Sequence, residues 1–236
     1  MDLFFGTTNP GKLRELRRLV AGLPVRVISP DDLGRPLPEV VEDGATFREN
    51  AEKKASAYGR FAGMFALADD SGLCVDALGG APGVHSARWS ELDDGLASPA
   101  CALAGAGARE LGQELARASR DEANNDKLLA ALAGLPEERR GGAYVAVLAV
   151  AGPDGTVAAQ VEGRCAGRIG HVRRGANGFG YDPVFVPASE LAAASPRTMA
   201  ELAPAEKDAL SHRGAAFRAL RPLLERLAFD KNGAQG

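Results

Sequence analysis

A short loop near the N-terminus is the feature that most constrains this chain. Residues 6–13 read Gly-Thr-Thr-Asn-Pro-Gly-Lys-Leu, which matches the phosphate-binding pattern G-x-x-x-x-G-K-[ST] except at its last position. In that pattern, backbone N–H groups and the lysine hold phosphates while the final hydroxyl binds Mg²⁺. Because Leu13 replaces the hydroxyl, a metal has to be held by carboxylates elsewhere, and the sequence offers Asp69-Asp70-Ser71-Gly72.

The residues around this loop predict a strand, the loop and a helix in that order. An apolar run at residues 2–6 comes first, and apolar residues then recur at helical spacing at Leu13, Leu16, Val20 and Leu23. Asn9 is a good N-cap and Pro10 a favoured first helical residue. Backbone N–H groups of the loop would therefore point out of a helix N-terminus, where an anion is stabilised.

Length and composition predict one globular domain. The chain has 236 residues, 45% of them hydrophobic, and a formal net charge of −3. We expect a single domain over residues 1–229, with a disordered tail at 230–236. Near-neutral charge predicts neither a nucleic acid nor a membrane as partner. The N-terminal residues form no signal or membrane span, and three distant cysteines fit reduced packing residues, so we expect a cytoplasmic protein.

The acidic pair is predicted to lie where a strand ends. Residues 64–68 are typical of a buried strand and residues 73–78 of a second one, with Ser71-Gly72 as the turn between them. Adjacent residues on an extended strand point to opposite faces, so we expect Asp69 and Asp70 to have different roles. One of them can bind Mg²⁺ while the other orients the turn.

The remaining pattern supplies further helices and strands. A capping box, Thr46-x-x-Glu49, opens a helix that runs to about residue 58. Residues 92–122 are rich in Ala, Gly and polar side chains and are interpreted as a partly helical surface insertion. Residues 143–150 and 156–161 predict a hairpin, and Ser211 caps a final helix.

Charged and aromatic residues elsewhere suggest a nucleotide site. Glu39, Glu42 and Asp43 form a second acidic cluster, and a Mg²⁺ ion that bridges phosphates takes only one or two carboxylates. Positive groups are scattered, at Lys12, Lys54, Lys207, His212 and Arg213. The stretch at 177–182, Asn-Gly-Phe-Gly-Tyr-Asp, suits stacking on a flat base and bonding to its edge. A turn with aromatic core anchors explains the same stretch equally well.

Six ordered segments together resemble one enzyme family. They are residues 7–12, Thr-Thr-Asn-Pro-Gly-Lys; 46–51, Thr-Phe-Arg-Glu-Asn-Ala; 68–73, Ala-Asp-Asp-Ser-Gly-Leu; 79–88, Gly-Gly-Ala-Pro-Gly-Val-His-Ser-Ala-Arg; 177–183, Asn-Gly-Phe-Gly-Tyr-Asp-Pro; and 211–213, Ser-His-Arg. In this order they resemble the inosine triphosphate pyrophosphatases, which hydrolyse non-canonical purine nucleoside triphosphates.

The resemblance implies a fold, a reaction and a set of site residues. The fold would be a two-lobed α/β structure around a long mixed β-sheet with flanking helices, the active site in the cleft between the lobes, and the assembly a homodimer. The reaction would convert a purine nucleoside triphosphate to the monophosphate and pyrophosphate with Mg²⁺. The implied phosphate-binding residues are Thr7, Thr8, Asn9, Pro10, Gly11 and Lys12, with Lys54 nearby. Asp70 would accept a proton and bind metal together with Glu42, which fits the spacing to Gly44-x-Thr46-Phe47, while Glu39, in a Leu-Pro-Glu segment, is the alternative. Ser71 would touch the substrate, and the base would meet Phe179, Gly180, Tyr181 and Asp182, with Lys207, His212 and Arg213 completing the pocket.

Three other functions remain open on the sequence. A pyrophosphatase for modified pyrimidine or methylated nucleotides could share the fold. A non-catalytic nucleotide sensor would keep the loop, although it would not need two acidic clusters. A P-loop kinase or NTPase is disfavoured by Leu13.

Overall fold

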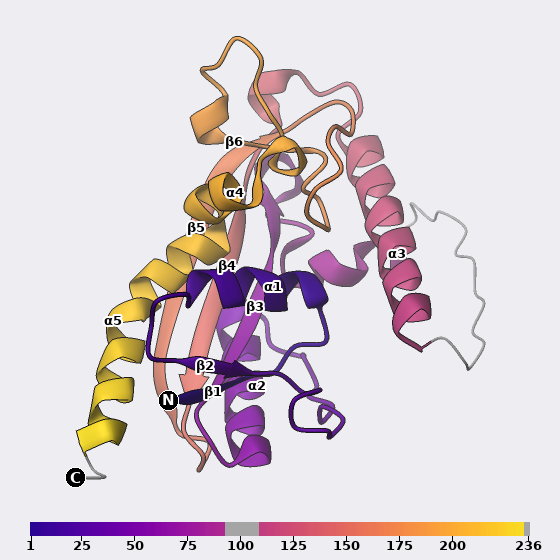
Figure 1. The fold of residues 1–236 in the computed structure, drawn as a ribbon. Coiled ribbons are helices and arrows are strands. Elements are labelled where there is room, and N and C mark those ends of the chain that lie inside the picture. The colour runs from indigo at the N-terminus through magenta and orange to yellow at the C-terminus, as the bar shows by residue number, and fades with distance from the viewer. Residues whose placement is uncertain (93–108, 234–236) are drawn as a thin grey trace. The chain divides into compact units, whose positions relative to one another are not determined.

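The computed structural model describes residues 1–92 and 109–233 and shows a mixed α/β fold (Figure 1). Its strands are β1 (Asp2–Phe5), β2 (Arg26–Ile28), β3 (Ala66–Val75), β4 (Gly141–Ala151), β5 (Val157–Ile169) and β6 (Phe185–Pro187). Its α-helices are α1 (Pro10–Leu19), α2 (Phe47–Ala62), α3 (Arg109–Ala131), α4 (Pro204–Leu210) and α5 (His212–Gly233). Short 3-10 helices cover Asp76–Leu78, Gly83–Glu91, Glu137–Arg139, Ala188–Glu190 and Met199–Glu201.

The six strands form one sheet in the order β2-β1-β3-β4-β5-β6. Strand β1 runs parallel to β2, with Leu3 opposite Val27, and parallel to β3, with Phe4 opposite Ala66. Strands β5 and β6 are antiparallel. The predicted mixed α/β sheet with flanking helices is therefore confirmed.

The chain divides into two compact units. The first consists of Met1–Ser71, Val145–Cys165 and Asp208–Gly236, and the second of Gly72–Tyr144 and Ala166–Lys207. Strands β3, β4 and β5 each contribute residues to both units. Each unit is described by itself below.

In the first unit, helices cover both faces of the sheet. One hydrophobic cluster joins β1, β3 and β4 to α1 and α5, through Leu3, Phe5, Leu16, Val20, Leu67, Ala146, Leu148, Val150, Ala216, Phe217, Leu220 and Leu224. The other joins the alternate residues of the same strands to α2, through Phe4, Ala51, Ala55, Tyr58, Ala66, Ala68, Val147, Ala149 and Ala151. Figure 1 shows α1 and α5 on the viewer's side of these strands and α2 behind them. The period-two alternation of strand side chains thus assigns each residue to a helix layer.

The start of α1 follows the sequence prediction. The Asn9 side chain accepts hydrogen bonds from the backbone N–H groups of Gly11 at 2.8 Å and of Lys12 at 3.2 Å, and Pro10 is the first helical residue. The two bonds satisfy helix N–H groups that have no partner within the helix.

Replacing Asn9 with alanine is expected to destabilise the protein by about 1 kcal/mol, because the N-cap acceptor is lost. Urea unfolding at neutral pH measures this change. Asn9→Asp, which keeps an acceptor at the same place, should stay within a few tenths of a kcal/mol of the wild type. Equal losses in both variants would contradict the capping role.

Three further element predictions are confirmed, the first with a small change. Thr46 caps α2 by accepting the N–H of Glu49 at 3.2 Å, while the Glu49 carboxylate accepts from Ala45, not from Thr46 as a capping box would have it. Strands β4 and β5 neighbour each other in the sheet on either side of a short turn, as predicted for the hairpin. Ser211 caps α5 by accepting the N–H of Gly214 at 3.0 Å.

Two boundary predictions differ from the structure. Of the predicted insertion at 92–122, residues 93–108 lie outside the described residues, and residues from Arg109 belong to α3, which continues unbroken to Ala131. The tail predicted to be disordered from residue 230 instead begins as helix, because α5 extends to Gly233; residues 234–236 are not described. Among the described residues, no helix is both long and apolar enough to cross a membrane.

Candidate active site

Strand β3 carries the acidic pair in its interior, not at its end. It is continuous from Ala66 to Val75, so the predicted turn at Ser71-Gly72 is wrong. Gly72 serves close packing instead, since a Cβ there would lie 2.3 Å from Ser86 Oγ and 2.5 Å from the Gly83 carbonyl oxygen. Because side chains alternate along a strand, Asp69 lies on the α1 and α5 face with Leu67, and Asp70 on the α2 face with Ala68.

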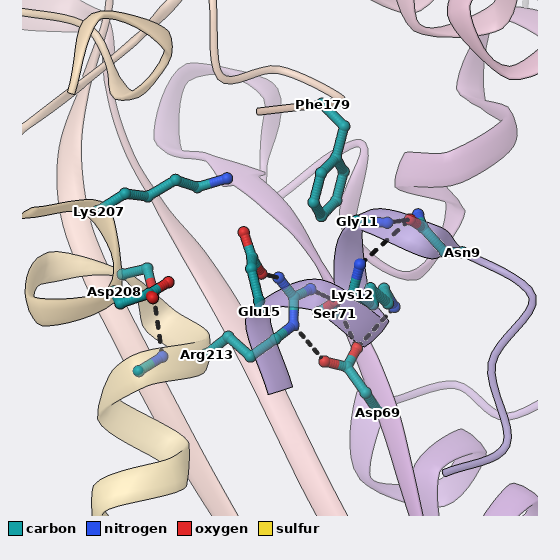
Figure 2. A network of polar contacts seen from close by, with 12 residues as sticks. Asn9, Gly11, Lys12, Glu15, Asp69, Ser71, Phe179, Lys207, Asp208 and Arg213 are labelled. Carbon is teal, nitrogen blue, oxygen red and sulfur yellow. Dashed lines mark hydrogen bonds and ion pairs between the residues drawn. The ribbon is translucent and has the colours of Figure 1, made fainter. Parts of the chain in front are cut away.

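Asp69 is buried between two cations. Its carboxylate accepts from Lys12 Nζ at 2.6 Å and from Arg213 Nε at 2.6 Å, and the Ser71 hydroxyl donates to it at 2.8 Å (Figure 2). Burial alone would raise the pKa of Asp69, but Arg213 and Lys12 outweigh it and hold the pKa well below its usual range. One aspartate of the pair was predicted to orient a turn, whereas Asp69 neutralises two cations, Lys12 and Arg213.

Arg213 is held by three protein groups. Besides Asp69, its guanidinium donates to Glu15 Oε2 at 2.5 Å and to Ser71 Oγ at 3.0 Å, and its side chain is only 4% exposed. We call Lys12, Glu15, Asp69, Ser71 and Arg213 the Asp69 network. Arg213 was predicted to contact the substrate. In the structure, its guanidinium binds other side chains of the protein.

Asp70 forms a separate cluster with Lys54 and Glu42, which we call the Asp70 cluster. Lys54 Nζ donates to Asp70 Oδ1 and to Glu42 Oε2, each at 2.8 Å. Burial raises the pKa of Asp70 to about 6, although Lys54 opposes the shift. Burial alone would lower the pKa of Lys54, but Asp70 and Glu42 raise it. Glu42, not the exposed Glu39, therefore shares a partner with Asp70, which favours Glu42 of the two predicted candidates.

The Asp70 cluster fits a divalent cation with few protein ligands. Asp70 Oδ2 is buried and has no hydrogen-bond partner, and such an atom calls for a donor or a cation. Among the described residues, no group of three or more His, Cys, Asp or Glu side chains could hold a metal. Two carboxylates suit Mg²⁺, which usually keeps several waters and takes its other ligands from substrate phosphates.

The loop at residues 7–12 is less open than the phosphate-binding pattern suggests. The N–H groups of Gly11 and Lys12 are taken by Asn9, and the Asn9 N–H donates to Thr7 Oγ1 at 3.1 Å. The Thr7 N–H donates to the Phe5 carbonyl oxygen. The predicted Asn9 cap therefore occupies the N–H groups of Gly11 and Lys12, and Lys12 Nζ is the charged group that the loop supplies.

In the second unit, Asp182 accepts hydrogen bonds that hold the segment predicted to contact the base, residues 177–182, which we call the base loop. Its Oδ2 accepts from Lys207 Nζ at 2.7 Å and from the Phe179 N–H at 3.0 Å, and Lys207 Nζ lies 4.8 Å from the centre of the Phe179 ring. Gly178 is required here, since its φ is +84° and a Cβ would meet Asp182 Oδ2 at 2.0 Å. The structure therefore brings three of the predicted residues together.

Tyr181 packs inside the second unit. It is 3% exposed, and its hydroxyl donates to the Ser86 carbonyl oxygen at 3.0 Å. Its side chain is a core anchor, which is the alternative that the sequence left open for this stretch. Trp89, in the same unit, is also buried.

The predicted site residues fall into both units. The first unit contains the loop at 7–12, Glu42, Lys54, Asp70, Ser71, His212 and Arg213, and the second contains Phe179, Gly180, Tyr181, Asp182 and Lys207. Sequence reasoning missed Glu15 and the role of Asp69 in the first unit, and Asp121 and Asn125 of α3 in the second. The adjacent asparagines at 124 and 125, which are poor helix formers in a helix interior, were the available signal.

Comparisons with known proteins identify the family of this chain. The sequence pattern of the Ham1 family matches residues 3–223. A dITP/XTP pyrophosphatase of Anaeromyxobacter dehalogenans is 72% identical over 97% of this chain and 99% of its own length. Among solved structures, a HAM1 protein from Coxiella burnetii superposes with a TM-score of 0.73 at 32% identity, over 96% of this chain and 99% of that one. A nucleoside-triphosphatase, also described as a dITP/XTP pyrophosphatase, from Mycobacterium abscessus gives a TM-score of 0.63 at 42% identity, over 95% of this chain and 99% of that one. On its sequence and its fold alike, this chain belongs to the Ham1 family.

Proposed function

We propose that this protein hydrolyses non-canonical purine nucleoside triphosphates, namely ITP, dITP and XTP, to the monophosphate and pyrophosphate, and so removes them from the nucleotide pool. The name of the relative that is 72% identical over nearly the whole chain supports this function. The observation that carries it is the Asp70 cluster, in which a buried carboxylate with a raised pKa and a partnerless oxygen lies against a lysine. This arrangement suits cleavage of a phosphoric anhydride.

The first unit supplies the groups for phosphate chemistry. Lys12 and Lys54 are cations that suit triphosphate oxygens. Ser71 adds a hydroxyl within the Asp69 network. Asp70 is suited to accept a proton from the attacking water, because its raised pKa lies close to neutral pH. The Asp69 network fixes Lys12, since the buried Asp69 carboxylate holds the lysine with a 2.6 Å ion pair.

Asp70 and Glu42 would hold Mg²⁺, which neutralises phosphate charge and supports departure of pyrophosphate when bound. Lys54 keeps both carboxylates close together before any cation binds. The Asp70 side chain is 10% exposed and that of Glu42 is 45% exposed. The Glu42 carboxylate can therefore adjust its position to a ligand.

The second unit is suited to recognising the base. Inosine and xanthosine carry an oxo acceptor at purine C6, where adenine carries an amino donor. A lysine ammonium donates only, so Lys207 favours the oxo group and leaves adenine mispaired. The Phe179 ring offers a flat surface for stacking. Guanine shares the oxo group, and its exclusion depends on contacts at its 2-amino group.

A homodimer in the cytoplasm completes the proposal. The family resemblance supports the dimer, and sedimentation equilibrium should give twice the mass of 24.5 kDa. Cleansing of a nucleotide pool requires the enzyme to meet that pool, which supports a cytoplasmic location.

The direct test is pyrophosphate release from the triphosphates of inosine, xanthosine, adenosine and guanosine, with Mg²⁺ and with a chelator. We expect metal-dependent turnover that favours inosine and xanthosine by at least about 100-fold, the range that a mispaired polar group produces. Equal turnover of all four, or none, would refute the proposal. Modified pyrimidine and methylated triphosphates would then be the next substrates to assay.

A further inference from the structure

Two side chains of helix α3 form hydrogen bonds with the backbone N–H and carbonyl groups of Gly180, in the base loop. Asp121 Oδ2 accepts the Gly180 N–H at 2.7 Å, and Asn125 Nδ2 donates to the Gly180 carbonyl oxygen at 2.9 Å. Asp121 and Asn125 are four residues apart, so both side chains lie on the same face of the helix. All three residues belong to the second unit. We call this arrangement the Gly180 clamp.

The orientation of the Asn125 amide is fixed by its surroundings. Its Nδ2 also donates to the Asp121 carbonyl oxygen at 2.8 Å, so the amide nitrogen faces two acceptors. The residue is 2% exposed, and its Oδ1 is buried without a hydrogen-bond partner. A buried acceptor without a partner costs stability, and asparagine is a poor residue in a helix interior. The hydrogen bond that Asn125 donates to the Gly180 carbonyl oxygen offsets this cost and fixes the position of Gly180.

The base loop needs hydrogen bonds from outside to order it, because its glycines allow the backbone many conformations. Gly178 and Gly180 both have positive φ, +84° and +63°, and nothing lies within 4 Å of a Cβ placed on Gly180. Glycine loses more conformational freedom on ordering than any other residue. The neighbouring Phe179 and Asp182 contact Lys207, so the orientation of the Gly180 peptides sets where these groups are presented.

We propose that Asp121 and Asn125 are positioning residues that hold Gly180 and thereby determine how strictly the base is selected. The inference deepens the proposed function, and its second half, the effect on base selection, rests on that function. The first half, that the clamp orders the loop, is independent of any substrate.

Amide hydrogen exchange of the free protein tests the ordering. In Asp121→Ala, exchange of the Gly180 amide should become about tenfold faster, while amides of β4 keep their protection. Asp121→Asn retains an acceptor and should restore most of the protection. Asp126→Ala is the matched control, because Asp126 lies on the same helix with an exposed side chain paired to Arg173. Unchanged Gly180 exchange in Asp121→Ala would overturn the proposal.

Substrate selectivity tests the second half. The ratio of kcat/KM for ITP to that for ATP should fall about tenfold in Asp121→Ala and in Asn125→Asp, mainly through a higher KM for ITP, and should recover in Asp121→Asn. A merely structural role would lower the active fraction and change both substrates equally, leaving the ratio unchanged, and that result would overturn the proposal. If the wild type itself fails to prefer ITP, the proposed function fails, while the exchange experiment still decides the clamp.

Discussion

Replacing Asp70 with asparagine is expected to lower kcat for ITP by about 10³-fold, within the range by which a general base accelerates a reaction. The substitution keeps the shape of the side chain and leaves an oxygen that can accept from Lys54, which lies 2.8 Å from Asp70 Oδ1. It removes the charge that would take up a proton and attract a divalent cation. Steady-state kinetics with saturating Mg²⁺ measures the change.

The matched control for Asp70→Asn is Asp43→Asn. Asp43 lies next to Glu42 in the chain, but its carboxylate is exposed and pairs with Lys53. An exposed ion pair contributes little, so kcat should stay within about twofold of the wild type. If Asp70→Asn kept more than a tenth of wild-type kcat, another group would have to be the proton acceptor.

Local sequence signals located the parts of the site that depend on local structure. Asn9 and Pro10 announce the start of α1 because capping involves only neighbouring residues. The alternation of strand side chains correctly predicted that Asp69 and Asp70 point to opposite faces, where they have different partners. The ordered motifs identified the family over nearly the whole chain, and the family pattern over residues 3–223 confirms them.

The errors arose where packing between distant segments decides. Ser71-Gly72 has the composition of a turn, yet Gly72 lies inside β3 because Ser86 and the Gly83 backbone approach it closely. Glu15 looks like an ordinary solvated helix residue, but its partner Arg213 is 198 positions away. Asp121 stood in a segment interpreted as an insertion, and only the fold brings it to Gly180. Contacts of this range leave no periodic trace in a single sequence.

Asp69→Asn, one residue before the catalytic candidate, is expected to affect stability far more than Asp70→Asn does. The Asp69 side chain is 1% exposed and pairs with Lys12 and Arg213, so its replacement removes the counter-charge of Lys12 and leaves Arg213 with Glu15 alone. Breaking a buried pair in this way costs about 3–5 kcal/mol. Urea unfolding at pH 7 measures the loss. Asp2→Asn, in an exposed pair with Arg26, should cost no more than about 1 kcal/mol.

The two aspartates should also differ in the sign of their effect on stability. The pKa of Asp69 is lowered on folding, so its charge stabilises the fold at neutral pH, and this contribution is lost as the pH falls below about 4 toward the folded pKa. The deficit of Asp69→Asn should therefore shrink in acid. The pKa of Asp70 is raised to about 6, so above that pH its charge works against folding. Asp70→Asn should consequently unfold at a urea concentration no lower than that of the wild type. A common deficit in both variants, unchanged between pH 7 and pH 3, would contradict the assignment of a stabilising charge to Asp69 and a destabilising charge to Asp70.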